Sequence, residues 1–142
     1  MKIIEHFIGG KEYSGSSKRL SSVYNPATGE ETAKVKLGSI EDLNLSVDTA
    51  KKALVSWSNT PPLQRARVLF KFKELIEKNE DELIRIIVSE HGKVYEDAKG
   101  SLTRGLEVVE YACGIPQMLK GEFTENVGKN VDSWSLRQPL GV

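Results

Sequence analysis

The only cysteine of the sequence, Cys113, is the first residue to consider as a nucleophile, because a thiolate with a base in reach can attack a carbonyl carbon. It follows Val108, Val109, Tyr111 and Ala112, and these apolar residues recur at helical spacing. A cysteine in such surroundings usually behaves as a small buried hydrophobic residue, and burial disfavours its thiolate. We therefore predict a structural role for Cys113.

The two histidines, His6 and His91, are the other candidates for a base or a metal ligand. His6 falls in a strand-like segment, and His91 precedes Gly92 at an expected helix end, where a protonated imidazole gains from the helix dipole. One cysteine and two histidines fall short of the four ligands of a structural zinc site. The sequence thus predicts no metal ligand and no catalytic residue in this chain.

Arg104 is the charged residue that stands out. It precedes Gly105 in a segment rich in apolar positions, and a guanidinium beside small residues can bind a carboxylate with two hydrogen bonds. The alternative is a surface ion pair with Glu107 or Glu110, one turn further along the same helix. The residue types by themselves favour the ion pair.

Two glycine motifs bind phosphate groups, G-x-G-x-x-G and G-x-x-x-x-G-K, and neither is present after an expected strand. The sequence therefore predicts no cofactor-binding residue. Gly9 and Gly10 are better interpreted as a hairpin turn. The charge clusters at residues 71–74 and 77–82 fall opposite the apolar faces of their helices and indicate solvated helix surface.

The composition limits the kinds of partner. The 142 residues include 20 basic and 20 acidic side chains, so no net charge attracts nucleic acid or an anionic membrane. No apolar run approaches a membrane span, and the first residues lack the apolar core of a signal peptide. A single cysteine fits a reducing compartment, and we expect a cytoplasmic protein.

The chain is expected to be α/β, with strands over residues 3–37 and helices over 40–120. Alternating apolar and polar residues predict the strands, and residues 25–29 (NPATG) predict a turn between two of them in a meander. Ser39 with Asp42 predicts a capping box for the first helix, whose apolar face carries Leu43 and Trp57.

The later helices are delimited by proline, asparagine and glycine. Pro61 fits a helix start, Asn79 with Glu82 resembles a cap for the next helix, and that helix should end near His91 and Gly92. A last helix is predicted over residues 95–118, where Gly100 and Gly105 indicate close packing or a bend.

The C-terminal stretch differs in character. Residues 121–130 are polar and predict a loop, whereas residues 131–142 favour an extended chain. The sequence finishes on an apolar run, which is typical of a chain that continues. A C-terminal strand docked in a sheet is the alternative.

Several segments together resemble the aldehyde dehydrogenase superfamily in their order and spacing. They are residues 25–30 (NPATGE), the 57–67 segment, 90–93 (EHGK) and 137–142 (RQPLGV). Within that family, residues 104–114 (RGLEVVEYACG), 121–122 and 132–135 resemble the CoA-acylating methylmalonate-semialdehyde branch. In that branch an arginine at the head of this helix helps to bind the substrate carboxylate, and Arg104 is the matching residue.

The resemblance implies a three-layer α/β/α fold, of which this chain holds only N-terminal strands and helices. Residues 1–130 would belong to the cofactor-binding domain, and 131–142 would begin a β-ribbon arm that pairs subunits into a dimer or tetramer. It also implies a semialdehyde substrate, NAD as cofactor and CoA as co-substrate. The family's oxyanion-stabilising Asn, Glu and nucleophilic Cys would lie beyond Val142, so the chain alone would be inactive.

Two alternatives stay open. The chain could belong to another branch, for example one acting on succinate semialdehyde without CoA. It could also be a naturally short helical module that binds a partner protein through the apolar faces of its helices.

Overall fold

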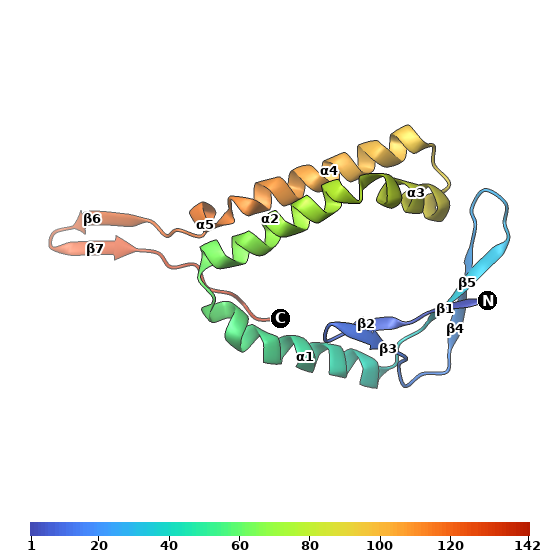
Figure 1. The fold of residues 1–142 in the computed structure, drawn as a ribbon. Helices are drawn as coiled ribbons and strands as arrows, with labels where there is room; N and C mark the ends of the chain where they lie inside the picture. The colour runs from blue at the N-terminus through green and yellow to red at the C-terminus, as the bar shows by residue number, and fades with distance from the viewer.

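The computed structural model describes residues 1–142 and shows short strands at both ends with helices between them (Figure 1). The first five strands are β1 (Lys2–Ile4), β2 (His6–Ile8), β3 (Lys11–Tyr13), β4 (Leu20–Tyr24) and β5 (Glu31–Lys36). The helices are α1 (Ile40–Asn59), α2 (Pro62–Lys78), α3 (Glu80–His91), α4 (Tyr95–Cys113) and α5 (Ile115–Met118). The last two strands are β6 (Phe123–Gly128) and β7 (Val131–Trp134).

The N-terminal strands form two sheets. β4 and β5 pair antiparallel around the predicted turn, in which Gly29 has a φ of 76° and Ala27 N donates to Asn25 Oδ1 at 2.9 Å. β1 joins the free edge of β5 in parallel, giving the order β1-β5-β4, so the predicted simple meander is wrong for this strand. β2 and β3 form a separate hairpin around Gly9 and Gly10, as predicted.

Most of the predicted helix ends are confirmed. Ser39 and Asp42 form the capping box of α1, α2 begins at Pro62, and α3 ends at Gly92, whose φ of 76° is left-handed. Asn79 is the N-cap residue of α3, as predicted, but its side chain makes no capping hydrogen bond: Nδ2 donates back to Leu75 O at 2.7 Å, at the end of α2.

The helix predicted over residues 95–118 is divided at Gly114 into α4 and α5. Pro116 explains the division, because proline has no N–H to continue the helical ladder. Helix α4 runs without interruption through Gly100 and Gly105, and a Cβ added at Gly105 would meet no atom within 4 Å. The close packing predicted for Gly105 is therefore not found in this chain.

The loop predicted over residues 121–130 is also wrong, because β6 lies within it and pairs antiparallel with β7. The hairpin has Asn126 and Asn130 at positive φ and a register irregularity between Thr124 and Gly128. Residues after Trp134 form no regular element.

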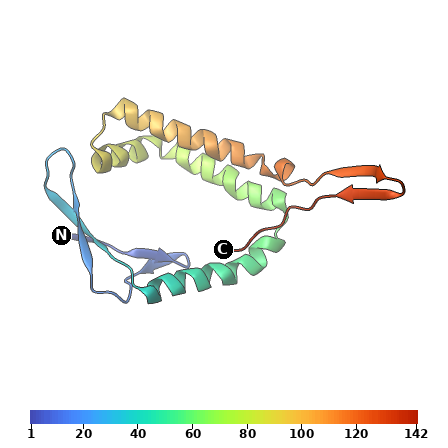
Figure 2. The same cartoon turned by 180° about the vertical axis from the view of Figure 1, so that it is seen from behind.

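The elements are arranged openly. Helices α2, α3 and α4 pack together as one layer. Helix α1 and the N-terminal strands form a separate part of the molecule, and the β6–β7 hairpin projects from the end where α2 begins and α4 finishes (Figures 1 and 2). The C-terminal segment runs back into the space between α1 and α2. None of the helices combines the length and apolar character that crossing a membrane requires.

Little of the chain is buried. Six of 142 residues are buried, and the accessible surface is 11074 Å², whereas a compact monomer of this mass exposes about 7,300 Å². The predicted apolar faces exist, but Leu43 of α1 is 62% exposed, Trp57 is 46% exposed and Phe72 of α2 is 50% exposed. The helical periodicity therefore predicted the helices correctly, but the apolar residues that define it are largely exposed to solvent in this chain.

Candidate functional site

The candidate site lies at the start of α4. Residues 92–94 connect α3 to α4, and the Lys93 side chain reaches along the first two turns of α4 to Ser101. Ser101 and Arg104 are three residues apart, which places them on the same face of the helix. One connection and one helix face thus bring Lys93, Ser101 and Arg104 together.

Both cations of this cluster bond to one hydroxyl group. Lys93 Nζ donates to Ser101 Oγ at 2.9 Å, and Arg104 Nη2 donates to the same oxygen at 3.3 Å. Neither cation takes part in an ion pair. The predicted alternative for Arg104 is wrong, because Glu110 pairs with Lys73 at 3.3 Å and Glu107 forms no ion pair.

The Arg104 guanidinium is accessible to solvent. Arg104 is exposed, whereas Lys93 and Ser101 are half-buried. A Cβ added at Gly100 would lie 3.5 Å from Arg104 Nη1, so the guanidinium lies over the glycine and leaves ordinary contact distance there. The cluster can therefore offer hydrogen-bond donors and positive charge to an anion without displacing any carboxylate.

A second polar cluster surrounds Asp42, which is only 3% exposed. Its carboxylate accepts from Ser39 N and from Ser16 N, each at 2.8 Å. The bond from Ser39 N is the largest of the causes that hold the pKa of Asp42 well below its usual range, with further contributions from Ser16 and the Tyr13 hydroxyl. Burial opposes these hydrogen bonds, so the cluster stabilises an ionised carboxylate that fastens the β3–β4 connection to α1.

His6 borders the Asp42 cluster. Its Nε2 is buried and has no hydrogen-bond partner, and a Cβ added at Gly15 would lie 3.0 Å from the imidazole ring. His91 forms the last residue of α3. The structure brings neither histidine to Cys113, and no group of three or more potential metal-ligating side chains occurs.

Cys113 is 8% exposed at the end of α4, which confirms the prediction that it is buried. Helix α4 packs against α2, and Cys113 is one of the six buried residues of the chain. The cysteine thus has the placement of a core residue.

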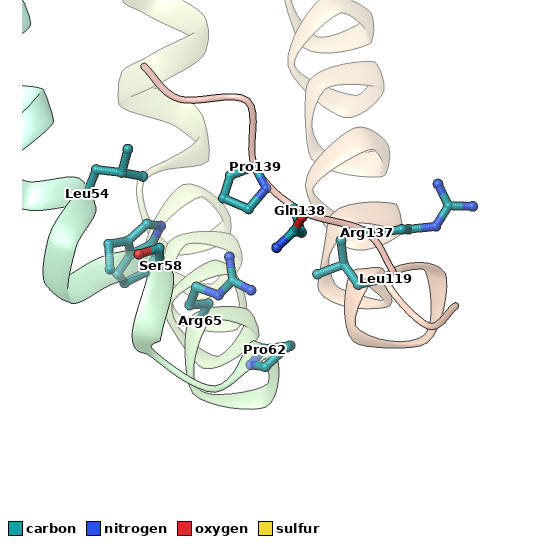
Figure 3. A pocket seen from close by; sticks show the side chains of 9 residues that line it. Leu54, Ser58, Pro62, Arg65, Leu119, Arg137, Gln138 and Pro139 are labelled. Atoms are coloured by element: carbon teal, nitrogen blue, oxygen red, sulfur yellow. The ribbon is translucent and has the colours of Figure 1, made fainter. Parts of the chain in front are cut away.

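A cavity of about 380 Å³ lies between the end of α1, the start of α2 and the C-terminal segment (Figure 3). Figure 3 shows Arg65 directed toward Gln138 and Pro139, while the Arg137 guanidinium extends away from the cavity past Leu119. Arg65 Nε is buried without a hydrogen-bond partner. The cavity contains one inward cation, and Arg104 does not line it.

Reasoning from sequence singled out Arg104 but missed Lys93 and Ser101. The spacing of Ser101 and Arg104 was available as a signal, because residues three apart share a helix face. Lys93 precedes the helix in irregular chain, and no periodicity predicts where such a side chain points. Its contact with Ser101 is a product of the α3–α4 connection.

The model of the aldehyde dehydrogenase family matches residues 13–142. A malonate-semialdehyde dehydrogenase of Pseudomonas aeruginosa is 48% identical over 142 residues, which is all of this chain and 28% of that protein. The mitochondrial acylating methylmalonate-semialdehyde dehydrogenase of Arabidopsis thaliana is 45% identical over 98% of this chain and 23% of its own length.

Solved structures agree with these sequence relatives. The methylmalonate-semialdehyde dehydrogenase of Oceanimonas doudoroffii matches 99% of this chain with a TM-score of 0.92 and 48% identity. A Sinorhizobium meliloti protein assigned to the same activity, solved in complex with NAD, matches 99% of this chain with a TM-score of 0.94 and 48% identity. The chain spans less than a third of each of these relatives.

Proposed function

This chain belongs to the aldehyde dehydrogenase family, and on that premise we propose that it is the N-terminal part of an NAD-dependent, CoA-acylating oxidoreductase. The substrate is methylmalonate semialdehyde or malonate semialdehyde, and the product is propionyl-CoA or acetyl-CoA. One aldehyde, one NAD⁺ and one CoA give one acyl-CoA, one NADH and one CO₂. The aldehyde carbon is oxidised, and its hydride reduces NAD⁺.

The observation that carries this proposal is the similarity of the whole chain to semialdehyde dehydrogenases. Relatives at 45–48% identity in sequence and structure are described by their malonate- or methylmalonate-semialdehyde activity. Identity falls to 27% or less for relatives described as acting on other aldehydes, such as the benzaldehyde dehydrogenase of Corynebacterium glutamicum at 26%. Similarity at this level favours the semialdehyde branch.

Within that function Arg104 binds the substrate carboxylate. Its exposed guanidinium has no acidic partner and hydrogen-bonds only to Ser101, so its remaining N–H groups are available to a carboxylate. No residue of this chain is assigned to the chemical steps. Cys113 is buried at the end of α4 and makes no hydrogen bond to a histidine, so it is not the nucleophile.

We assign no NAD-binding residue to this chain. The helix that follows the N-terminal strands is α1, and a dinucleotide phosphate would need free N–H groups at such an N-terminus. There the Asp42 carboxylate already accepts from Ser39 N, and its negative charge would repel a phosphate. We therefore assign NAD and CoA binding to the rest of a longer protein.

Domain organisation follows the same proposal. Residues 1–130 belong to the cofactor-binding domain, and residues 131–142 begin an arm through which subunits assemble into a dimer or tetramer. Because β6 pairs with β7 in one projecting, fully exposed hairpin, we extend the arm to include β6; the hairpin supports a role in pairing, since exposed strand edges readily add further strands. The protein acts in the cytoplasm.

The test is to read the gene past the codon of Val142, express the complete frame and measure NADH formation. We expect activity with methylmalonate or malonate semialdehyde that requires CoA, an acyl-CoA product identified by mass spectrometry, and no activity from residues 1–142 alone. A complete enzyme that prefers succinate semialdehyde and releases a free acid without CoA would overturn the proposal.

A further inference from the structure

Arg104 shares a hydrogen-bonded cluster with Lys93 and Ser101, to which neither the sequence pattern nor the family similarity assigns a role. Ser101 Oγ accepts hydrogen bonds from Lys93 Nζ at 2.9 Å and from Arg104 Nη2 at 3.3 Å. A hydroxyl has two acceptor positions and one hydrogen. Both acceptor positions are taken by cations here, so the Ser101 hydrogen is left for an acceptor outside the cluster.

The charge around this hydroxyl is unbalanced. Two positive side chains contact the same oxygen, and neither forms an ion pair with an acidic residue. Like charges this close repel, and half-burial of Lys93 reduces the screening of that repulsion by water. An anion placed against the cluster would relieve the repulsion and accept from all three groups.

The geometry limits the anion to a small one. Lys93 Nζ and Arg104 Nη2 both lie within hydrogen-bond distance of Ser101 Oγ, so an anion that contacts all three side chains must be placed beside this one hydroxyl. A carboxylate offers two oxygens with about four acceptor positions, which suits two cations and one hydroxyl. Because residue 100 is glycine, no side chain at this position occupies the space beside Arg104 Nη1.

We propose that Lys93, Ser101 and Arg104 together form a site for the carboxylate of an acidic aldehyde substrate, with Lys93 as a second charged ligand. This inference rests on the proposed function for the identity of the anion, but the site itself belongs to residues 1–142. Lys93 binds the carboxylate and also holds Ser101, and Ser101 positions the Arg104 guanidinium.

The experiment titrates the complete protein, expressed from the full reading frame, with sodium propionate at constant ionic strength and follows the heat of binding by isothermal titration calorimetry. Propionamide, a neutral molecule of similar size, is the control ligand. We expect saturable heats with propionate and none with propionamide. Absence of saturable heats with propionate, or equal heats with propionamide, would overturn the site.

Variants test each member of the cluster. Lys93→Met should weaken propionate binding about tenfold, and Ser101→Ala should weaken it by a smaller factor. Lys99→Met is the matched control, because it removes a positive charge six residues away, in the first turns of α4, at a residue that pairs with Glu80 at 4.0 Å. If Lys93→Met lowers the helical circular dichroism, Lys93→Gln replaces it.

The outcomes separate this inference from the function on which it rests. Loss of binding in Arg104→Met with full binding in Lys93→Met would leave the assignment of Arg104 intact and overturn the role of Lys93. Propionate binding that needs all three side chains, in a protein whose complete form rejects carboxylated aldehydes, would support the site and contradict the proposed function.

Discussion

Ser39 and Asp42 satisfy each other's backbone across the first turn of α1. Ser39 N donates to Asp42 Oδ2 at 2.8 Å, and Asp42 N donates to Ser39 Oγ at 3.2 Å. The other carboxylate oxygen, Oδ1, accepts from Ser16 N at 2.8 Å. One aspartate therefore caps the helix and also fixes the chain between β3 and β4 against it.

Asp42→Asn should destabilise the chain, and the stability of the variant should depend less on pH in the acid range. The hydrogen bond from Ser39 N is foremost in lowering the pKa of Asp42 below its ordinary 3.8, so the ionised form stabilises the folded state. A lowered pKa gives stability that is present above about pH 4 and is lost as the pH falls toward the folded pKa.

The measurement is thermal unfolding by circular dichroism at pH 5, 4, 3 and 2. At pH 5 the variant should melt about 5 °C or more below the original chain, and the difference should shrink toward pH 2. Asp48→Asn, the same change at an exposed residue of α1, is the control. A constant difference across the pH range would contradict the role of the Asp42 charge.

Gly92→Ala should lower the free energy of unfolding by about 1–2 kcal/mol. Gly92 has a φ of 76°, and its added Cβ would lie 3.0 Å from Pro26 Cγ in the β4–β5 turn. The strain of a left-handed alanine and the contact with proline act in the same direction. Urea unfolding gives the free energy.

Gly105→Ala is the matched opposite, because Gly105 lies within α4 and has open space where a Cβ would be. It should raise the free energy of unfolding by about 0.5–1 kcal/mol in this chain. A loss of stability on this substitution would show that Gly105 is packed against something in solution.

Cys113 should react slowly with a thiol reagent such as Ellman's reagent. Because its side chain is buried at the end of α4, labelling of the native chain should be at least about tenfold slower than in urea. Similar rates in both conditions would mean that the α2–α4 packing opens readily. Such a result would also remove the physical argument against a reactive Cys113.

Thermal unfolding recorded with light scattering tests whether the chain is a piece of a larger fold. The accessible surface of 11074 Å² and the exposed apolar faces of α1 and α2 predict light scattering as the chain unfolds on heating, and binding of an apolar dye before it unfolds. A sharp transition without scattering would identify an autonomous domain and contradict the proposed role of the chain as part of a longer enzyme.

Local features of this protein were determined by the sequence alone. The capping box of α1, the turn after Asn25, the start of α2 at proline and the left-handed end of α3 all depend on residues within a few positions of one another. The β6 strand was missed because both of its faces are exposed, which removes the apolar alternation that marks a half-buried strand.

Long-range features were decided only by the tertiary structure. The parallel pairing of β1 with β5 and the bond from Ser16 to Asp42 join residues 26 or more apart, and no sequence period encodes such a register. The sequence predicted Arg104 as a carboxylate ligand through resemblance, whereas the direction of the α3–α4 connection placed Lys93 on Ser101 beside it. Local hydrogen bonds are determined by residues that are neighbours in the sequence, whereas contacts between distant segments depend on how the whole chain packs.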